Sequence, residues 1–272
     1  MWRRTLDCLG VPVGILAGAA LATRLDAVFR GYREMGAPPA VAYELVGGAA
    51  PVVLRDGAPA RRLDVEEDLV PALELDLYRE VVARAEGLVL HAGAVVGQGG
   101  VALVVAGRSG AGKSTLVRAM LAAGFGYISE ECVALRGGRC VGLSRPLHVD
   151  DGAVAPPAGF TVDDYVVRQE GGDRRLRLFH PPEALMWRDD ACAAAVVHID
   201  HAPGSATALE PLAGGAALAE LWPCAFRADQ AALADAANAL NEVNVYRLRS
   251  ATPEAALARV RALAAELDVH PL

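Results

Sequence analysis

The sequence contains few aromatic residues and almost no lysine. Trp, Tyr and Phe make up 5% of the 272 residues, so the core must be built mainly from Ala, Val and Leu. Of the 26 basic residues, only Lys113 is a lysine, and the other 25 are arginines. If that lysine fell at random among the basic positions, it would stand at any given one about one time in 26. Its position therefore indicates a role that the bulkier guanidinium of arginine cannot fill.

The chain also has few cysteines, and its net charge is negative. The five cysteines are odd in number and widely spaced, with no CxxC pair: Cys8, Cys132, Cys140, Cys192 and Cys224. This pattern argues against a disulfide framework and a zinc site, and it favours a reducing, cytoplasmic setting. The formal net charge of −7 argues against a general nucleic-acid binder, which needs a basic face.

No hydrophobic run is long enough to cross a bilayer. The apolar stretch VPVGILAGAALA (11–22) follows Arg3 and Arg4 and loosely imitates a signal peptide, but Asp7 and Gly10 interrupt the approach to it. We therefore expect a cytoplasmic protein with neither a nucleic-acid nor a membrane partner.

Hydrophobic periodicity predicts an α/β fold with a smaller mixed region at residues 1–64. That region alternates short strands with turns and contains at most one helix, near 22–34. Two apolar runs, 88–96 and 101–107, flank a Gly-rich turn and predict a β-hairpin. The remaining pattern predicts further strands at 125–135, 193–200 and 244–250, and helices at 65–86, 114–124, 213–223, 227–243 and 252–267.

The stretch AGRSGAGKSTL (106–116) fits the phosphate-loop pattern G-x-x-x-x-G-K-[ST] between a predicted strand and a predicted helix. Its glycines let the backbone amides converge on phosphate oxygens, and the helix adds its positive N-terminal end. Lys113 would reach the β- and γ-phosphates of ATP, and Ser114 would bind Mg²⁺. The alternative is a Gly-rich turn without a ligand. The predicted nucleotide-binding residues are Gly107, Ser109, Gly110, Ala111, Gly112, Lys113, Ser114 and Thr115.

Two adjacent acids follow the loop by one helix and one strand. Glu130 and Glu131 come 17 and 18 residues after Lys113, a spacing that places them on the strand beside the loop. Since neighbouring strand residues point to opposite faces, one acid could face Mg²⁺ while the other accepts a proton from an incoming hydroxyl. His91 precedes the loop across the hairpin. A lone histidine near a strand is more often structural than catalytic, so its role depends on where the hairpin places it.

Together, LHAGAVV, GRSGAGKST and YISEECVAL resemble the catalytic core of the HPr kinase/phosphorylase family and its smaller relatives. The resemblance covers about residues 88–135. It implies a P-loop kinase core of the HPr kinase and phosphoenolpyruvate carboxykinase type, with residues 65–272 as the catalytic domain and residues 1–64 as a region that could recruit the substrate. It also implies that Glu130 is the acid/base carboxylate, that Ser114 and Glu131 hold the metal, and that His91 lies near the transferred phosphate.

The smaller relatives include kinases that phosphorylate a serine of ribosomally made precursor peptides, among them lasso peptides. The resemblance therefore implies an ATP- and Mg²⁺-dependent serine kinase acting on a peptide or small protein, and it allows a homo-oligomer. The family's acid pair is usually Asp-Asp or Asp-Glu, whereas this chain has Glu-Glu, and no stretch matches the family's later Gly-rich segment for phosphorolysis. Two other functions stay open: a small-molecule kinase of the same fold, and a non-catalytic nucleotide-binding module.

The remaining candidates are basic residues and histidines. RRLRL (174–178) could dock an acidic peptide or phosphates, although a solvated charged strand is the commoner explanation. Arg145 is a further candidate for a phosphate contact. His180, His198 and His201 do not show a metal-ligand spacing with a third ligand, so we expect structural roles for them.

Overall fold

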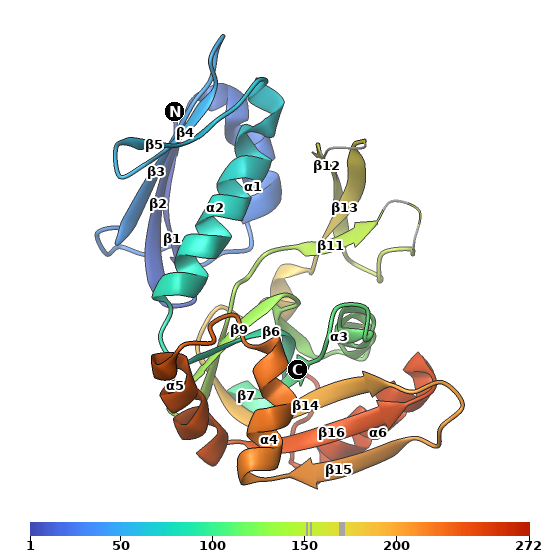
Figure 1. Cartoon of the computed structure of the whole chain (residues 1–272). Helices are drawn as coiled ribbons and strands as arrows, with labels where there is room; N and C mark the ends of the chain where they lie inside the picture. Colours follow the sequence, from blue (N-terminus) through green and yellow to red (C-terminus); the bar gives the residue numbers. More distant parts are fainter. Residues whose placement is uncertain (151, 153, 169–171) are drawn as a thin grey trace. The chain divides into compact units, whose positions relative to one another are not determined.

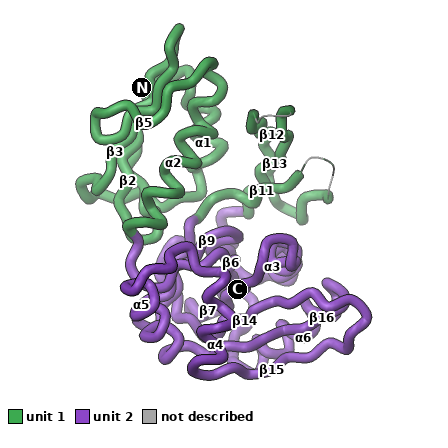
Figure 2. The backbone as a smooth tube through the Cα atoms, viewed as in Figure 1, with its two compact units in different colours: residues 1–84, 144–181 green, residues 85–143, 182–272 purple. Residues whose placement is uncertain are grey.

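In the computed structural model, two segments far apart in the sequence fold together (Figures 1 and 2). Residues 1–84 and 144–181 form unit 1, and residues 85–143 and 182–272 form unit 2. The structure describes residues 1–150, 152, 154–168 and 172–272. The mixed α/β class that the sequence predicts is confirmed, because each unit combines helices with sheets.

Unit 1 contains a five-stranded sheet in the order β1-β2-β3-β4-β5. Strand β3 alternates buried and exposed residues, with Val41, Tyr43 and Leu45 buried, as expected for a sheet that is covered on one face. The elements of this part are β1 (Trp2–Cys8), β2 (Val11–Ala17), α1 (Ala22–Phe29), β3 (Val41–Val46), β4 (Val52–Arg55), β5 (Ala58–Arg62) and α2 (Leu69–Arg84).

Helix α2 is tied to this sheet by polar contacts. The Tyr43 hydroxyl donates to Asp76 over 2.9 Å, and Arg55 pairs with the same carboxylate at 3.0 Å. The expected boundary between residues 64 and 65 therefore differs from the division of the structure, in which α2 stays with the N-terminal sheet as far as Arg84.

A second, three-stranded sheet completes unit 1, with the order β11-β13-β12. Its strands are β11 (Leu147–Asp150), β12 (Thr161–Val167) and β13 (Arg174–His180). Glu74 of α2 joins it to the rest of the unit, because this carboxylate accepts a hydrogen bond from Tyr165 at 2.9 Å and pairs with Arg145 at 2.9 Å. The sequence could not indicate that residues 144–181 return to the N-terminal part.

Unit 2 is built on an eight-stranded sheet in the order β10-β9-β6-β7-β14-β16-β15, with β8 paired to β6. Strands β7, β14 and β16 are parallel, and the other pairings are antiparallel. The strands are β6 (Leu88–Val96), β7 (Val101–Ala106), β8 (Gly126–Ser129), β9 (Cys132–Arg136), β10 (Arg139–Gly142), β14 (Ala191–His201), β15 (Ala208–Leu212) and β16 (Asn244–Ser250).

Helices cover this sheet on both faces. Residues of α4 and α5 join the hydrophobic cluster formed by alternate residues of β6 and β7, whereas α3 packs against β6 and beside α6. The helices are α3 (Lys113–Ala122), α4 (Gly214–Leu221), α5 (Gln230–Asn241) and α6 (Pro253–Glu266). The predicted hairpin and the five predicted helices are confirmed, and α6 begins as expected, with the Thr252 hydroxyl accepting from the amide of Ala255 at 3.2 Å.

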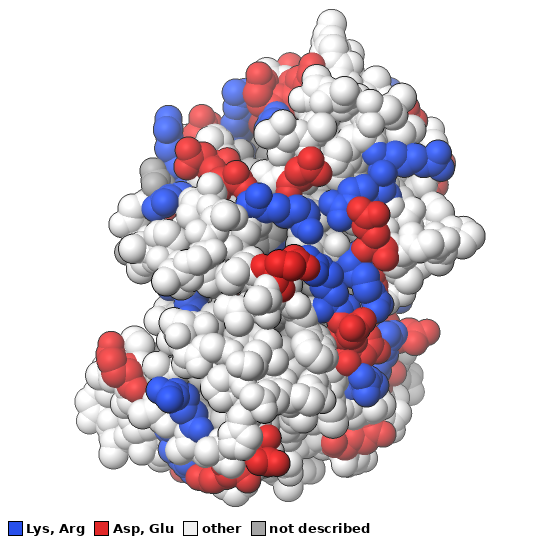
Figure 3. All heavy atoms as spheres, turned by 180° about the vertical axis from the view of Figure 1, so that it is seen from behind, with Lys and Arg blue, Asp and Glu red and all other residues white. Residues whose placement is uncertain are grey.

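Among the described residues, no helix combines the length and the apolar character that a membrane crossing requires. Acidic and basic side chains lie intermingled on the face seen in Figure 3.

Candidate functional site

The phosphate-loop sequence forms the connection between β7 and α3. Strand β7 ends at Ala106, and α3 begins at Lys113 after a turn in which Gly110 and Gly112 have φ angles of +79° and +98°. Side-chain-bearing residues rarely adopt this left-handed conformation, which explains the glycines. The eight residues predicted to bind the nucleotide, 107 and 109–115, lie in this turn and in the first residues of the helix.

The start of α3 suits an anion. Gly112 is the N-cap of this ten-residue helix, and no side chain among the described residues caps it. The first amides of a helix lack partners within the helix and carry a positive partial charge, so they can bind phosphate oxygens. The loop therefore fits the phosphates that the sequence pattern predicts.

Lys113 is folded back over this loop. Its ammonium donates to the carbonyl oxygens of Gly107 at 2.9 Å and Arg108 at 3.2 Å, and the residue is 6% exposed. Burial lowers the pKa of Lys113, while the negative charges of Glu131 and Glu130 act in the opposite direction. Both predicted acids are thus close enough to influence the same ammonium group.

Glu130 and Glu131 lie between two strands rather than at the end of one. The single strand expected over 125–135 is interrupted after Ser129 and resumes at Cys132, and both parts pair with β6. The buried Ser129 hydroxyl explains the break, since it accepts hydrogen bonds from the amides of Glu131 at 3.4 Å and Cys132 at 3.3 Å. The acids therefore occupy a turn held by a serine.

The two acids have different surroundings. Glu130 is 4% exposed, whereas the Glu131 side chain is 34% exposed and its carboxylate lies 3.5 Å from Nδ1 of His91. A close approach supports this arrangement, because a Cβ at Gly93 would lie 3.4 Å from the Cα of Glu130 and 2.6 Å from a methyl group of Val117 on α3. Gly93 thus lets β6 approach both the acid turn and the helix that follows the phosphate loop.

His91 lies beside the acid pair. Its Nδ1 is 3.2 Å from the carbonyl oxygen of Glu131. Burial lowers the pKa of His91, the charge of Lys113 lowers it further, and Glu131 opposes both effects. The net lowering of the His91 pKa favours the neutral form of the imidazole. Because a carbonyl oxygen only accepts, Nδ1 carries the proton and Nε2 is left as an acceptor.

A segment with no recognisable pattern completes the surroundings of the loop. Beyond the end of β7, Ala225 forms an antiparallel β-bridge with Leu90 of β6. The ring of Phe226 meets the ring of His91 edge-on, with 5.8 Å between the ring centroids. Cys224, in the short helix Trp222–Cys224, hydrogen-bonds the backbone of Gly107, and burial raises the pKa of its thiol. Sequence reasoning missed Cys224 and Phe226, since only folding brings Cys224 to Gly107 and Phe226 to His91.

The basic candidates outside the loop belong to unit 1. Arg145 forms an ion pair with Glu74 at 2.9 Å, and Arg174 forms one with Asp150 at 2.8 Å. The guanidinium of Arg177 lies over the Phe179 ring. Arg175 borders a pocket within the same unit. These contacts give Arg145, Arg174 and Arg177 structural partners, and the docking role of RRLRL stays a prediction.

Of the three other candidate histidines, His180 and His198 lie beside acidic residues. His180 Nε2 lies 3.1 Å from Asp163, and His198 Nδ1 lies 2.8 Å from Glu220. Burial lowers the pKa of both imidazoles. His201 is exposed and lines a pocket beside the phosphate loop.

The phosphate loop and the acid pair offer few protein ligands for a divalent metal ion. Within the described parts of the chain, no three His, Cys, Asp or Glu residues cluster as a metal site. Mg²⁺ at nucleotide sites is held by one or two protein oxygens together with the substrate's phosphates, so a hydroxyl and a carboxylate are a suitable donor set. Ser114 and Glu131 carry donors of these two types, and a shared metal site between them stays a prediction.

Comparisons with known proteins leave the family open. No family model and no curated protein matches the sequence. The structure is similar to that of the Hpr(Ser) kinase/phosphatase from Coxiella burnetii, with 12% identity, coverage of 65% of this chain and 98% of that chain, and a TM-score of 0.32. A TM-score this low does not define a shared fold.

Proposed function

We propose that the chain is a kinase that uses ATP and Mg²⁺ and transfers the γ-phosphate to a serine hydroxyl of a peptide or small protein. One observation carries the proposal: the only lysine of the chain lies in a phosphate-type loop, within electrostatic reach of Glu130, Glu131 and His91. This combines groups that hold phosphate with groups that accept a proton.

In this proposal, the α3 amides and Lys113 hold the phosphates, while Ser114 and Glu131 hold the metal. When bound, Mg²⁺ supplies positive charge that neutralises the phosphate oxygens. The buried Glu130 accepts the proton of the acceptor hydroxyl, and the neutral His91 lies next to the group that is transferred. The serine acceptor is taken from the resemblance of the motifs at 88–135, not from a pocket.

Labelled phosphate transfer tests the proposal. The full chain is incubated with Mg²⁺, [γ-³²P]ATP and either serine-containing peptides or a panel of free metabolites. We expect label in a peptide, and we expect Lys113→Ala to reduce transfer about 10²–10³-fold, as for the loss of one group that stabilises transition-state charge. Arg261→Ala, at an exposed position on α6, is the matched control and should transfer at the wild-type rate.

The outcomes separate the three functions. Undiminished transfer by Lys113→Ala would contradict the role of the loop. Label in a metabolite but in no peptide would favour a small-molecule kinase. ATP binding without transfer to any acceptor would favour a non-catalytic nucleotide-binding module.

A further inference from the structure

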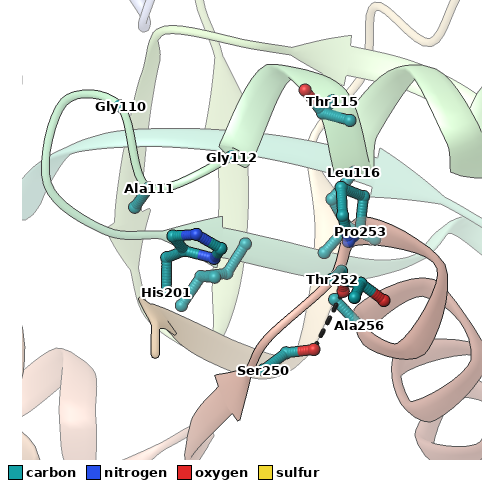
Figure 4. A pocket seen from close by; sticks show the side chains of 11 residues that line it. Gly110, Ala111, Gly112, Thr115, Leu116, His201, Ser250, Thr252, Pro253 and Ala256 are labelled. Atoms are coloured by element: carbon teal, nitrogen blue, oxygen red, sulfur yellow. Dashed lines mark hydrogen bonds between the residues drawn. The ribbon is translucent and has the colours of Figure 1, made fainter. Parts of the chain in front are cut away.

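A pocket lies beside the phosphate loop (Figure 4). Its volume is about 230 Å³, and its walls come from the loop, the start of α3, the ends of β14 and β16 and the start of α6. All of these elements belong to unit 2. None of the lining residues is Lys, Arg, Asp or Glu, so the pocket suits an uncharged group.

The sheet order fixes where this pocket lies relative to the acids. Strand β6 carries His91 and pairs with β8 and β9, the two strands that flank the turn containing Glu130 and Glu131. Strand β7 has β6 on one side and β14, followed by β16, on the other. The phosphate loop starts at the end of β7, between these two flanks. Phosphates held by the loop can therefore present one end to Glu130 and direct the other toward the pocket.

The floor of the pocket is apolar. Leu116, Ile199 and Ala256 are 4%, 5% and 6% exposed, and they come from α3, β14 and α6. His201 lies at the side of the pocket nearest Ala111 in Figure 4, where its exposed ring can stack on a flat group. Apolar contact on one side and a ring on another favour a planar, heteroaromatic ligand.

The rim adds polar groups. The Ser250 hydroxyl donates to the carbonyl oxygen of Thr252 over 2.9 Å, and Thr115 and Thr252 also line the pocket. A nucleotide base has apolar faces and polar atoms along its edge, which matches a pocket with an apolar floor and a polar rim. The volume is below the ~300–1,000 Å³ typical of pockets for a whole drug-sized ligand, so the pocket holds one part of a larger molecule.

We propose that this pocket binds the purine base of the nucleotide whose phosphates lie in the loop, an inference that rests on the proposed function. Stacking on His201 and burial against Leu116, Ile199 and Ala256 give ATP an affinity that its triphosphate part alone does not have. The pocket is thus a specificity site for the phosphate donor.

Calorimetric titration with two probes tests this inference. The full chain is titrated with ATP and with inorganic tripolyphosphate, each with Mg²⁺, and the wild type should bind ATP at least about tenfold more tightly, the order expected for one stacked base. Ala256→Leu fills the pocket from a helix in which leucine is well tolerated. We expect it to weaken ATP binding about tenfold and to leave tripolyphosphate binding unchanged.

Two further variants complete the design. Ala258→Leu makes the same change at an exposed position of α6 and should alter neither affinity. His201→Ala removes the ring without filling the pocket and should also weaken ATP selectively.

Each remaining result is decisive. Equal wild-type affinity for the two probes, or unchanged ATP affinity in both Ala256→Leu and His201→Ala, would overturn the base site and leave the proposed function standing. The base site is equally overturned if Ala256→Leu raises only the KM for an acceptor peptide, because the pocket would then hold the acceptor. Failure of the wild type to bind either probe would instead overturn the proposed function.

Discussion

Gly93→Ala should disturb the site without changing any group that is proposed to bind or react. Gly93 lies on β6 between the acid turn and α3. An added Cβ would approach Cγ2 of Val117 to 2.6 Å and the carbonyl oxygen of Ser129 to 3.3 Å. The contact with Val117 is about 1 Å shorter than the ~3.5–4.0 Å optimum between carbon atoms. Helix α3 or strand β6 must therefore move, and β6 contacts the acid turn.

The magnitude follows from this displacement. Overpacking of a dense core costs about 1–3 kcal/mol, and a misplacement of ~1 Å can cost ~10²-fold in rate. We therefore expect Gly93→Ala to lower the free energy of unfolding by about 2 kcal/mol, measured by urea denaturation, and to lower phosphate transfer by up to about 10²-fold. Adding Val117→Ala removes the methyl group in conflict, so the double variant should recover part of both losses. Wild-type stability of Gly93→Ala, or no recovery in the double variant, would refute this account of the packing.

Three further predictions concern stability, each measured by urea denaturation. Glu74→Gln replaces the carboxylate that pairs with Arg145 in a largely buried setting by a neutral amide and should cost about 3 kcal/mol. Glu86→Gln, in a pair whose carboxylate side chain is 84% exposed, should cost less than about 1 kcal/mol, and equal losses would contradict the difference in burial. Asp229→Ala removes the side chain that caps the N-terminus of α5 and should cost about 1 kcal/mol, whereas Asp229→Asn should cost little. A free energy of unfolding that is unchanged in Asp229→Ala would show that the cap contributes nothing. Burial lowers the pKa of His180 to about 4, so the unfolded chain binds a proton there that the folded chain does not. Stability should therefore fall as the pH drops from about 6.5 toward 4, and His180→Gln should make that fall smaller; an unchanged pH dependence in this variant would contradict the assignment.

Local patterns predicted what local physics determines. The hairpin of β6 and β7, the turn into α3 and the Thr252 cap of α6 each depend on a few neighbouring residues. The position of the only lysine also marked the loop before any fold was known. The predicted groups at residues 91, 113, 130 and 131 then lie close to one another, whereas their roles stay predictions.

Long-range contacts set the limits of sequence reasoning. The break between β8 and β9 depends on how the Ser129 side chain bonds to the backbone, which strand periodicity does not encode. Phe226 reaches His91 across 135 positions of the chain, counted from their numbers, and no spacing rule links them. The return of residues 144–181 to the N-terminal unit depends on Glu74, whose pairing with Arg145 appears only in the fold.

In the proposed function, one set of groups binds ATP and another activates the acceptor hydroxyl. Glu130→Gln separates these two roles when ATP affinity is measured by calorimetry and phosphate transfer is measured on the same preparation. We expect ATP affinity within about threefold of the wild type, since Glu130 is assigned no contact with the phosphates. We expect phosphate transfer to fall about 10²-fold or more, within the ~10²–10⁴-fold range of a positioned general base. Transfer at the wild-type rate, or a loss of ATP affinity that accounts for the whole loss of transfer, would contradict this separation of roles.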